Sequence, residues 1–136
     1  MRIYIVMAFK ICDTHNDLIT AEDFDGTVKF LSENSGRLKA VVLAVWTTHT
    51  KYNNWPDIET LANQYKNLPL KTRLLFGIED ISFAAEEDYP AIAKFKPFYA
   101  SLTWNYDNAL GGGAYGETGL TEKGREMLKL FSHSGI

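Results

Sequence analysis

The sequence predicts an α/β fold in which about four parallel strands alternate with helices. Short apolar runs alternate with amphipathic segments four times along the chain, and this order favours a parallel sheet with right-handed crossovers. The chain has 136 residues, of which 46% are hydrophobic. This is enough to build one hydrophobic core but not two, so we expect one domain.

The first strand is predicted from the apolar run IYIVMAFKI at 3–11, and the polar stretch CDTHNDL at 12–18 follows it. The segment FDGTVKFLSENSG at 24–36 then predicts a short helix that is closed by Gly36. The run KAVVLAVW at 39–46 predicts the second strand. Its continuous apolar character is typical of a strand with both faces covered.

The segment at 55–68 is the clearest helix, because Pro56 suits a first helical turn. Its apolar residues recur on one helical face. These residues are Trp55, Ile58, Leu61, Ala62, Tyr65 and Leu68. Next, TRLLFGIE at 72–79 predicts the third strand, DYPAIAKFK at 88–96 a short helix, and PFYASLTW at 97–104 the fourth strand.

A long glycine-rich loop leads to a last helix at 121–135. Thr121 suits its N-cap, Gly135 suits its C-terminal stop, and we expect Met127, Leu128 and Phe131 to face inward. A complete (β/α)8 barrel of the TIM type needs about 250 residues. We therefore expect residues 1–136 to form one partial barrel domain, the N-terminal half, truncated before strand five.

Composition excludes several classes of function. The net charge is −3 with both signs interspersed, so the sequence offers no basic stripe for nucleic acid. Cys12 is the only cysteine, which excludes an internal disulfide and a cysteine-rich zinc site, and favours a reducing, cytoplasmic setting. The run at 3–9 is too short to span a bilayer, so a buried strand is favoured over a signal peptide and no membrane partner is expected.

Polar candidates follow the predicted strands, and the carboxyl ends of parallel strands meet at one rim. His15 and Asp17 lie on the same side of an extended chain, together with Asp13 if the extension reaches that far. Glu79 ends an apolar strand, where an ionised carboxylate is costly unless it is paired or bound to metal. One imidazole and two carboxylates suit zinc or another divalent ion.

Other interpretations of these residues stay open. A His-x-Asp pair is also typical of a capped turn, Glu79 has Lys71 and Arg73 as possible partners, and Asp80 can cap the next segment. We expect His49 to be a loop residue and His133 to lie in the last turn of a helix. No Lys-Ser or Lys-Thr follows the glycines at 111–113, so they are interpreted as a flexible loop and not as a phosphate cradle.

Four stretches in this order resemble the membrane dipeptidase family, also called renal dipeptidase-like, a group of metal-dependent peptidases. These stretches are DTHNDL, FGIED, SLTWNYDNALGGGAYGETGLT and GREMLKLFSHSGI. The resemblance implies a (β/α)8 barrel with two zinc ions that hydrolyses dipeptides. It also implies that His15 and Asp17 bind one ion and that Glu79 bridges both.

The same resemblance implies two further histidine ligands and a proton-handling aspartate on later strands. His133 is not carried over, because its register matches the end of the fourth helix. Where some members have a substrate-contacting histidine, this chain has Trp104, whose indole N–H donates one hydrogen bond. Trp104 is therefore the candidate substrate-binding residue, and no catalytic residue is assigned.

Two alternatives to a dipeptidase remain. A half-barrel that lacks catalysis would be stabilised by self-association as a homodimer, because two open sheet edges invite pairing. Another metal-dependent hydrolase of the amidohydrolase type is the second alternative, although those enzymes typically open with His-x-His and this chain has His-x-Asp.

Overall fold

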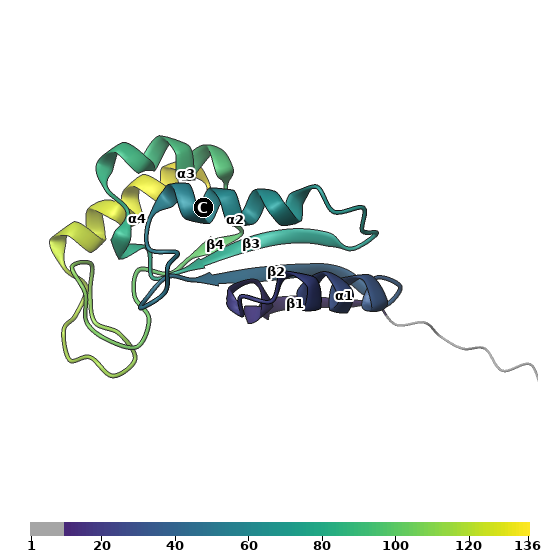
Figure 1. Cartoon of the computed structure of the whole chain (residues 1–136). Helices are drawn as coiled ribbons and strands as arrows, with labels where there is room; N and C mark the ends of the chain where they lie inside the picture. The colour runs from purple at the N-terminus through teal and green to yellow at the C-terminus, as the bar shows by residue number, and fades with distance from the viewer. Residues whose placement is uncertain (1–9) are drawn as a thin grey trace, which may run out of the picture.

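The computed structural model describes residues 10–136, which form a curled sheet of four parallel strands with helices on one face (Figure 1). The strands follow one another in chain order: β1 (Ile11–Asn16), β2 (Leu38–Trp46), β3 (Arg73–Glu79) and β4 (Tyr99–Ala100). The helices are α1 (Phe24–Asn34), α2 (Trp55–Lys66), α3 (Tyr89–Phe95) and α4 (Glu122–Ser134). Three short 3-10 helices lie between them: η1 (Asp17–Thr20), η2 (Ile81–Phe83) and η3 (Glu86–Asp88). The predicted α/β class and the alternation of strands and helices are confirmed.

The first strand was predicted from residues 3–11, and the structure describes the chain from residue 10 on. The apolar run at 3–9 lies outside the described residues. What the structure shows is that β1 runs through the polar motif to Asn16, with an irregular register against β2 between Asp13 and Asn16. His15 therefore belongs to the strand itself and not to a loop after it.

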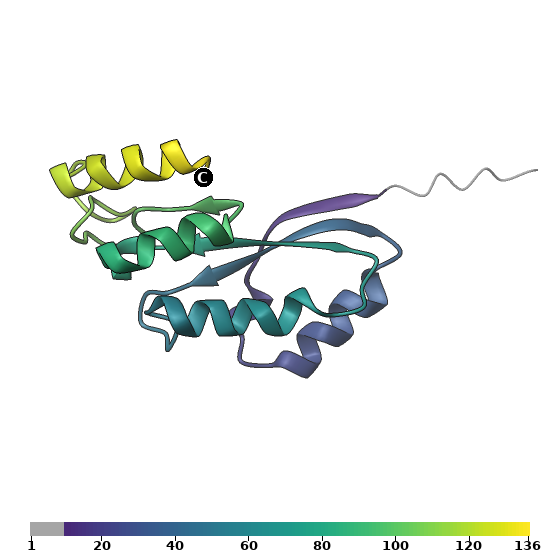
Figure 2. The same cartoon turned by 90° about the horizontal axis from the view of Figure 1, so that it is seen from above.

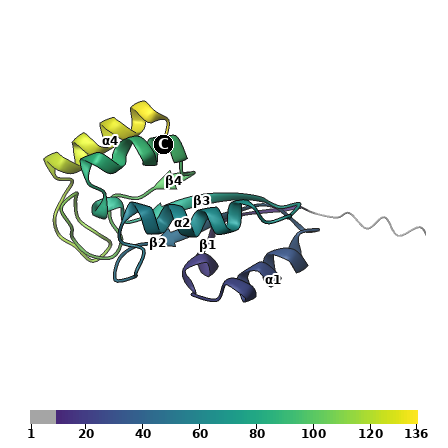
Figure 3. The ribbon, with the colours of Figure 1, turned by 45° about the horizontal axis from the view of Figure 1, so that its top comes forward.

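The helix-covered face of the sheet forms the core. Alternate residues of β2, namely Val41, Leu43 and Val45, are fully buried and belong to one apolar cluster that includes side chains from all four helices. Figures 2 and 3 show α3 and α4 lying together at the β4 side of the sheet, and an edge contact between Tyr89 and Phe131 joins them. On the opposite face of β2, Val42 and Ala44 are buried as well, and the polar residues of the rim lie at the carboxyl ends of the strands.

Local capping chemistry explains where the three longest helices begin. The side chains of Asp23, Asn54 and Thr121 each accept a hydrogen bond from the backbone N–H three residues further on. A cap of this kind contributes about 1 kcal/mol. The predicted Thr121 cap is confirmed, and so is the stop at Gly135, which adopts the left-handed conformation with φ 73°.

Two details predicted for the helices are wrong. Helix α1 ends at Asn34 with Ser35 as its C-cap, so Gly36 does not close it. Leu128 is 46% exposed because it lies about 100° around α4 from Met127, and Met127 and Phe131 already fill the inward face.

The fourth strand is also shorter than the predicted range 97–104. It comprises Tyr99–Ala100, flanked by backbone bonds from Phe98 to Phe76 and from Ser101 to Ile78. Past Ser101 the chain leaves the sheet, because side chains bind its carbonyls: the Ser101 hydroxyl donates to Thr103 and the Asn108 amide donates to Leu102.

No helix in the stretch 10–136 is long and apolar enough to cross a membrane.

Candidate metal centre

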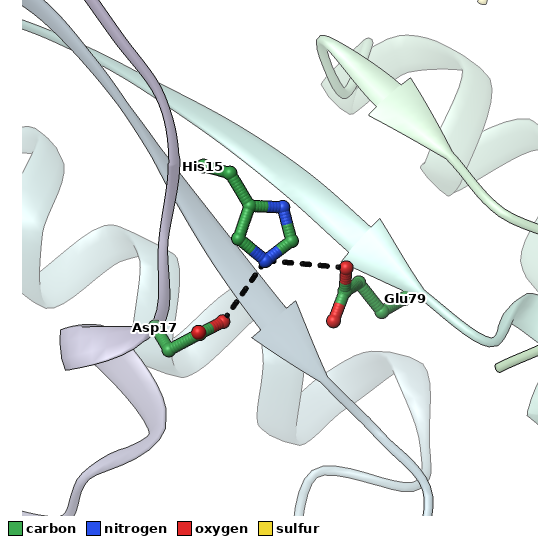
Figure 4. A group of neighbouring side chains, drawn as sticks. All are labelled: His15, Asp17 and Glu79. Atoms are coloured by element: carbon green, nitrogen blue, oxygen red, sulfur yellow. Dashed lines mark ion pairs between the residues drawn. The ribbon is translucent and has the colours of Figure 1, made fainter. Parts of the chain in front are cut away.

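Three predicted ligands meet at the carboxyl ends of the strands. His15 comes from β1, Asp17 from the start of η1 and Glu79 from the last position of β3. The Nε2 atom of His15 lies 3.2 Å from Asp17 Oδ1 and 3.4 Å from Glu79 Oε1. Figure 4 shows both carboxylates turned toward this one nitrogen. Among residues 10–136 this is the one group of such side chains whose ligand atoms all lie within 4.8 Å of one another.

The chain turns sharply within the motif, and this turn places Asp17. Asn16 caps η1 by accepting a hydrogen bond from the Leu18 N–H, so Asp17 starts a helical turn instead of continuing the strand. The carboxylate of Asp13 accepts from the His15 N–H and from the Asn16 side chain. Asp13 is therefore held within its own strand end and does not join the cluster. The polar turn that the motif predicted is present, and His15 and Asp17 also lie close enough together to share an ion.

Glu79 is held by the backbone of the neighbouring strand end. Thr47 donates to the Glu79 carbonyl from both its N–H, at 3.2 Å, and its hydroxyl, at 2.9 Å. The Glu79 side chain is only 17% exposed. Burial raises the pKa of its carboxyl above the usual range, His15 partly opposes this rise, and Asp17 adds to it. In the described chain Glu79 pairs with His15, and no ion pair joins it to Lys71 or Arg73.

Tyr99 is a fourth member of the cluster that the sequence reasoning missed. Its hydroxyl lies 3.2 Å from His15 Nδ1, on the side of the ring away from the carboxylates, and the two rings are nearly parallel. Burial, followed by the nearby carboxylates of Glu79 and Asp17, raises the pKa of Tyr99 to about 12. The phenol therefore keeps its proton at neutral pH.

A glycine on β3 makes room for Tyr99. Gly77 is the cross-strand partner of Tyr99, and a Cβ atom added there would lie 2.3 Å from the tyrosine ring. Gly77 and Glu79 are two residues apart on one strand and share a face. A glycine two positions before the candidate ligand was the signal in the sequence, but only the register shows which side chain fills the space.

A hollow of about 520 Å³ opens beside the three ligands. Trp46, the cross-strand partner of Glu79, forms part of its wall, and the Trp104 ring packs against Trp46 at 4.5 Å between centroids. The indole N–H of Trp46 is buried without a hydrogen-bond partner among the described residues. The remaining lining residues are His15, Asp17, Thr20, Ala21, Thr50 and Glu79. Trp104 thus lies where a molecule next to the cluster would contact it.

Asp80 holds the loops around the hollow together. It adopts the left-handed conformation with φ 67°, is buried, and caps η2 as predicted. Its carboxylate also accepts from the hydroxyl of Thr48 at 2.7 Å and from the amide of Asn108 at 2.8 Å. The loops after β2, β3 and β4 are therefore joined at one side chain.

The remaining histidines lie away from the cluster. His49 is exposed in the loop after β2, with φ 59°. His133 lies in the last turn of α4, where its Nδ1 atom contacts the Lys129 carbonyl oxygen. Both placements are as predicted. Glycines 111–113 belong to the long loop between β4 and α4 and do not line the hollow.

One imidazole and two carboxylates are donor types that zinc accepts. Zinc ligands lie about 2.0–2.2 Å from the metal at tetrahedral angles, so two ligand atoms on one ion are about 3.4 Å apart. The two separations from His15 Nε2, 3.2 and 3.4 Å, match this spacing, and all three ligand atoms lie within 4.8 Å of one another. The same separations also suit a protonated imidazole between two carboxylates, and its pairing with the exposed Asp17 is worth about 0–1 kcal/mol.

Comparisons of the chain with protein-family models, with curated proteins and with solved structures found no match. Support for a function therefore comes from the sequence motifs and from the geometry of the rim.

Proposed function

We propose that this chain is part of a zinc-dependent dipeptidase. In this proposal the four strands are the N-terminal half of a (β/α)8 barrel, His15 and Asp17 bind one zinc ion, and Glu79 bridges it to a second. The observation that carries the proposal is the convergence of these three side chains from β1, from η1 directly after it and from the non-adjacent strand β3. The resemblance of the four sequence stretches to the membrane dipeptidase family supplies the substrate class.

The electrostatics of the cluster support a cation at this point. Two carboxylates face each other across a single imidazole, and burial of Glu79 disfavours its ionised form. A divalent cation between them offsets both the repulsion and the desolvation of Glu79. Lys and Arg side chains are absent from the lining of the hollow, so neither residue type supplies that positive charge there.

Zinc, when bound, would supply a coordinated water of lowered pKa and would polarise a peptide carbonyl. The residues of this chain would orient the dipeptide beside it. Trp104 and Trp46 form an aromatic wall next to the ligands, which suits an apolar side chain of the substrate. The Trp104 indole N–H is the donor that this wall offers to a substrate carbonyl or carboxylate, because the Trp46 N–H is buried.

The three ligands on β1, η1 and β3 provide one complete ion position and the bridge to another. The resemblance assigns the second ion's histidines to strands other than the four described. We therefore expect the 136-residue chain to bind one zinc ion and, by itself, to hydrolyse dipeptides slowly or not at all.

Zinc titration by calorimetry tests the metal site. Wild type should bind one ion, and His15→Ala and Asp17→Asn should each weaken binding by at least tenfold because each removes one of three ligands. His133→Ala is the matched control, since that imidazole lies on α4 away from the cluster, and its affinity should equal that of wild type. No zinc binding by wild type, or equal loss in the control, would rule out the site.

Turnover by the zinc-loaded chain tests the chemistry. We would assay a panel of dipeptides with apolar and charged side chains, together with an N-acyl amino acid and a phosphate monoester. Rapid dipeptide hydrolysis would show that a second copy or other ligands complete the site. Preference for either of the other two substrates would instead favour a different metal-dependent hydrolase.

A second candidate is a half-barrel stabilised by self-association. Both β1 and β4 are edge strands of the described sheet, and Ile11 and Phe98 beside these edges are 54% and 56% exposed. Unpaired edges and exposed apolar side chains favour pairing with another chain. Sedimentation should then show a homodimer, and a well-folded monomer across the accessible concentration range would exclude this candidate.

A further inference from the structure

Tyr99 contacts the one nitrogen of His15 that does not face the carboxylates. The Nε2 atom of His15 points to Asp17 and Glu79, while Nδ1 lies 3.2 Å from the Tyr99 hydroxyl. The two rings are tilted by only 9° relative to each other. Both edges of the imidazole are therefore engaged, and rotation of the ring about its Cβ–Cγ bond would break contacts on both sides.

We infer that Tyr99 is the positioning residue for His15, holding Nδ1 so that Nε2 is the atom presented to a divalent cation. This inference rests on the proposed function, because it assigns a role within the proposed metal site. A ligating histidine usually bonds to a second group through its other nitrogen, and this bond sets the tautomer and the ring orientation. The structure places a phenol in that position.

A phenol suits the site both with and without a bound cation, because its hydroxyl can donate or accept a hydrogen bond. Without a cation, the Tyr99 hydroxyl donates to Nδ1, and the proton on Nε2 points to the two carboxylates. With a cation on Nε2, the imidazole proton resides on Nδ1 and is donated to the Tyr99 oxygen. A phenylalanine at this position would do neither and would leave Nδ1 without a partner.

The backbone around Tyr99 keeps the phenol in place. The Phe98 N–H donates to the Phe76 carbonyl at 2.7 Å, and the Ser101 N–H donates to the Ile78 carbonyl at 2.9 Å. Tyr99 lies between these two bonds, opposite Gly77, whose missing side chain leaves the space that its ring occupies. The short length of β4 does not loosen this residue, because it lies within the paired segment.

The first experiment compares zinc affinities of wild type and Tyr99→Phe by competition with a chelating dye. Phe keeps the ring in the space beside Gly77 and removes only the hydroxyl. The expected loss of affinity is about 10–100-fold, as for other partners of metal-bound histidines. Tyr115→Phe is the matched control, because Tyr115 is 75% exposed in the long loop, and its affinity should stay within about twofold of wild type.

The second experiment needs no variant, so a folding defect in Tyr99→Phe leaves the inference testable. Nitrogen-15 NMR of the wild-type His15 ring should show Nδ1 as an unprotonated acceptor without zinc and as a protonated donor with zinc. Equal affinities in wild type and Tyr99→Phe, or a protonated Nδ1 in the zinc-free protein at a pH where the ring is neutral, would overturn the positioning role alone. Failure of wild type to bind zinc would overturn the proposed function as well.

Discussion

The buried carboxylate of Asp80 should contribute a large part of the stability of the rim. Asp80 accepts hydrogen bonds from the Ser82 N–H, the Asn108 amide and the Thr48 hydroxyl, and it is only 7% exposed. Asp80→Ala removes all three hydrogen bonds, and a hydrogen bond of this kind is worth about 1 kcal/mol net. The loss from hydrogen bonding is therefore about 3 kcal/mol.

The backbone conformation adds to this loss. Asp80 has φ 67°, a left-handed conformation that asparagine and aspartate tolerate better than alanine. Alanine there costs about a further 1 kcal/mol. In Asp80→Asn the amide oxygen can still accept from Ser82 and Asn108, while the Thr48 hydroxyl can turn to accept from the new amide. We therefore expect a loss of less than about 1.5 kcal/mol for Asn and about 4 kcal/mol for Ala.

Urea unfolding followed by tryptophan fluorescence and far-ultraviolet circular dichroism measures both losses. The unfolding midpoint should fall strongly for Asp80→Ala and slightly for Asp80→Asn, with similar denaturant slopes for the two variants. Equal losses for the two variants, or a loss below about 1 kcal/mol for alanine, would refute the assignment of Asp80 as the residue that joins the three loops.

Gly77→Ala should weaken zinc binding as strongly as loss of the Tyr99 hydroxyl does, because the new Cβ displaces the tyrosine ring; competition with a chelating dye measures this. Glu79→Gln should abolish zinc binding but raise the free energy of unfolding of the zinc-free protein at pH 7. The Glu79 pKa is raised in the folded state, so its contribution to stability is present in acid and is lost as the pH rises through that pKa. Wild type and Glu79→Gln should therefore become equally stable below about pH 4 in urea unfolding series. Gly124→Ala should destabilise the fold by about 1–3 kcal/mol despite the better helix propensity of alanine, because the Cβ would lie 2.0 Å from the Leu110 carbonyl oxygen.

Controls for these variants come from the same chain. Gly36→Ala places a Cβ in open space at a residue outside the left-handed region, so its stability should equal or slightly exceed that of wild type. A Gly124→Ala protein as stable as Gly36→Ala would contradict the close approach of α4 to the loop. A Glu79→Gln protein less stable than wild type at pH 7 would contradict the burial cost assigned to Glu79.

Much of the fold follows from local signals in the sequence. The order of the strands and helices and the caps at Thr121 and Gly135 were predicted, because periodicity and capping depend on residues a few positions apart. The meeting of His15 with Glu79 at one rim also followed, since parallel strands of one sheet end on the same side. Whether these residues bind zinc stays a prediction.

Tertiary structure alone decided the surroundings of that cluster. Asp13 is turned away by bonds within its own strand end, and Leu128 is exposed because the inward face of α4 is already filled. Tyr99 reaches His15 across 84 positions of sequence, through a register that pairs it with Gly77. Residue types and short-range spacing determine which side chains arrive at the rim, whereas the contacts each one makes depend on strand register and on space left by distant neighbours, which no local pattern encodes.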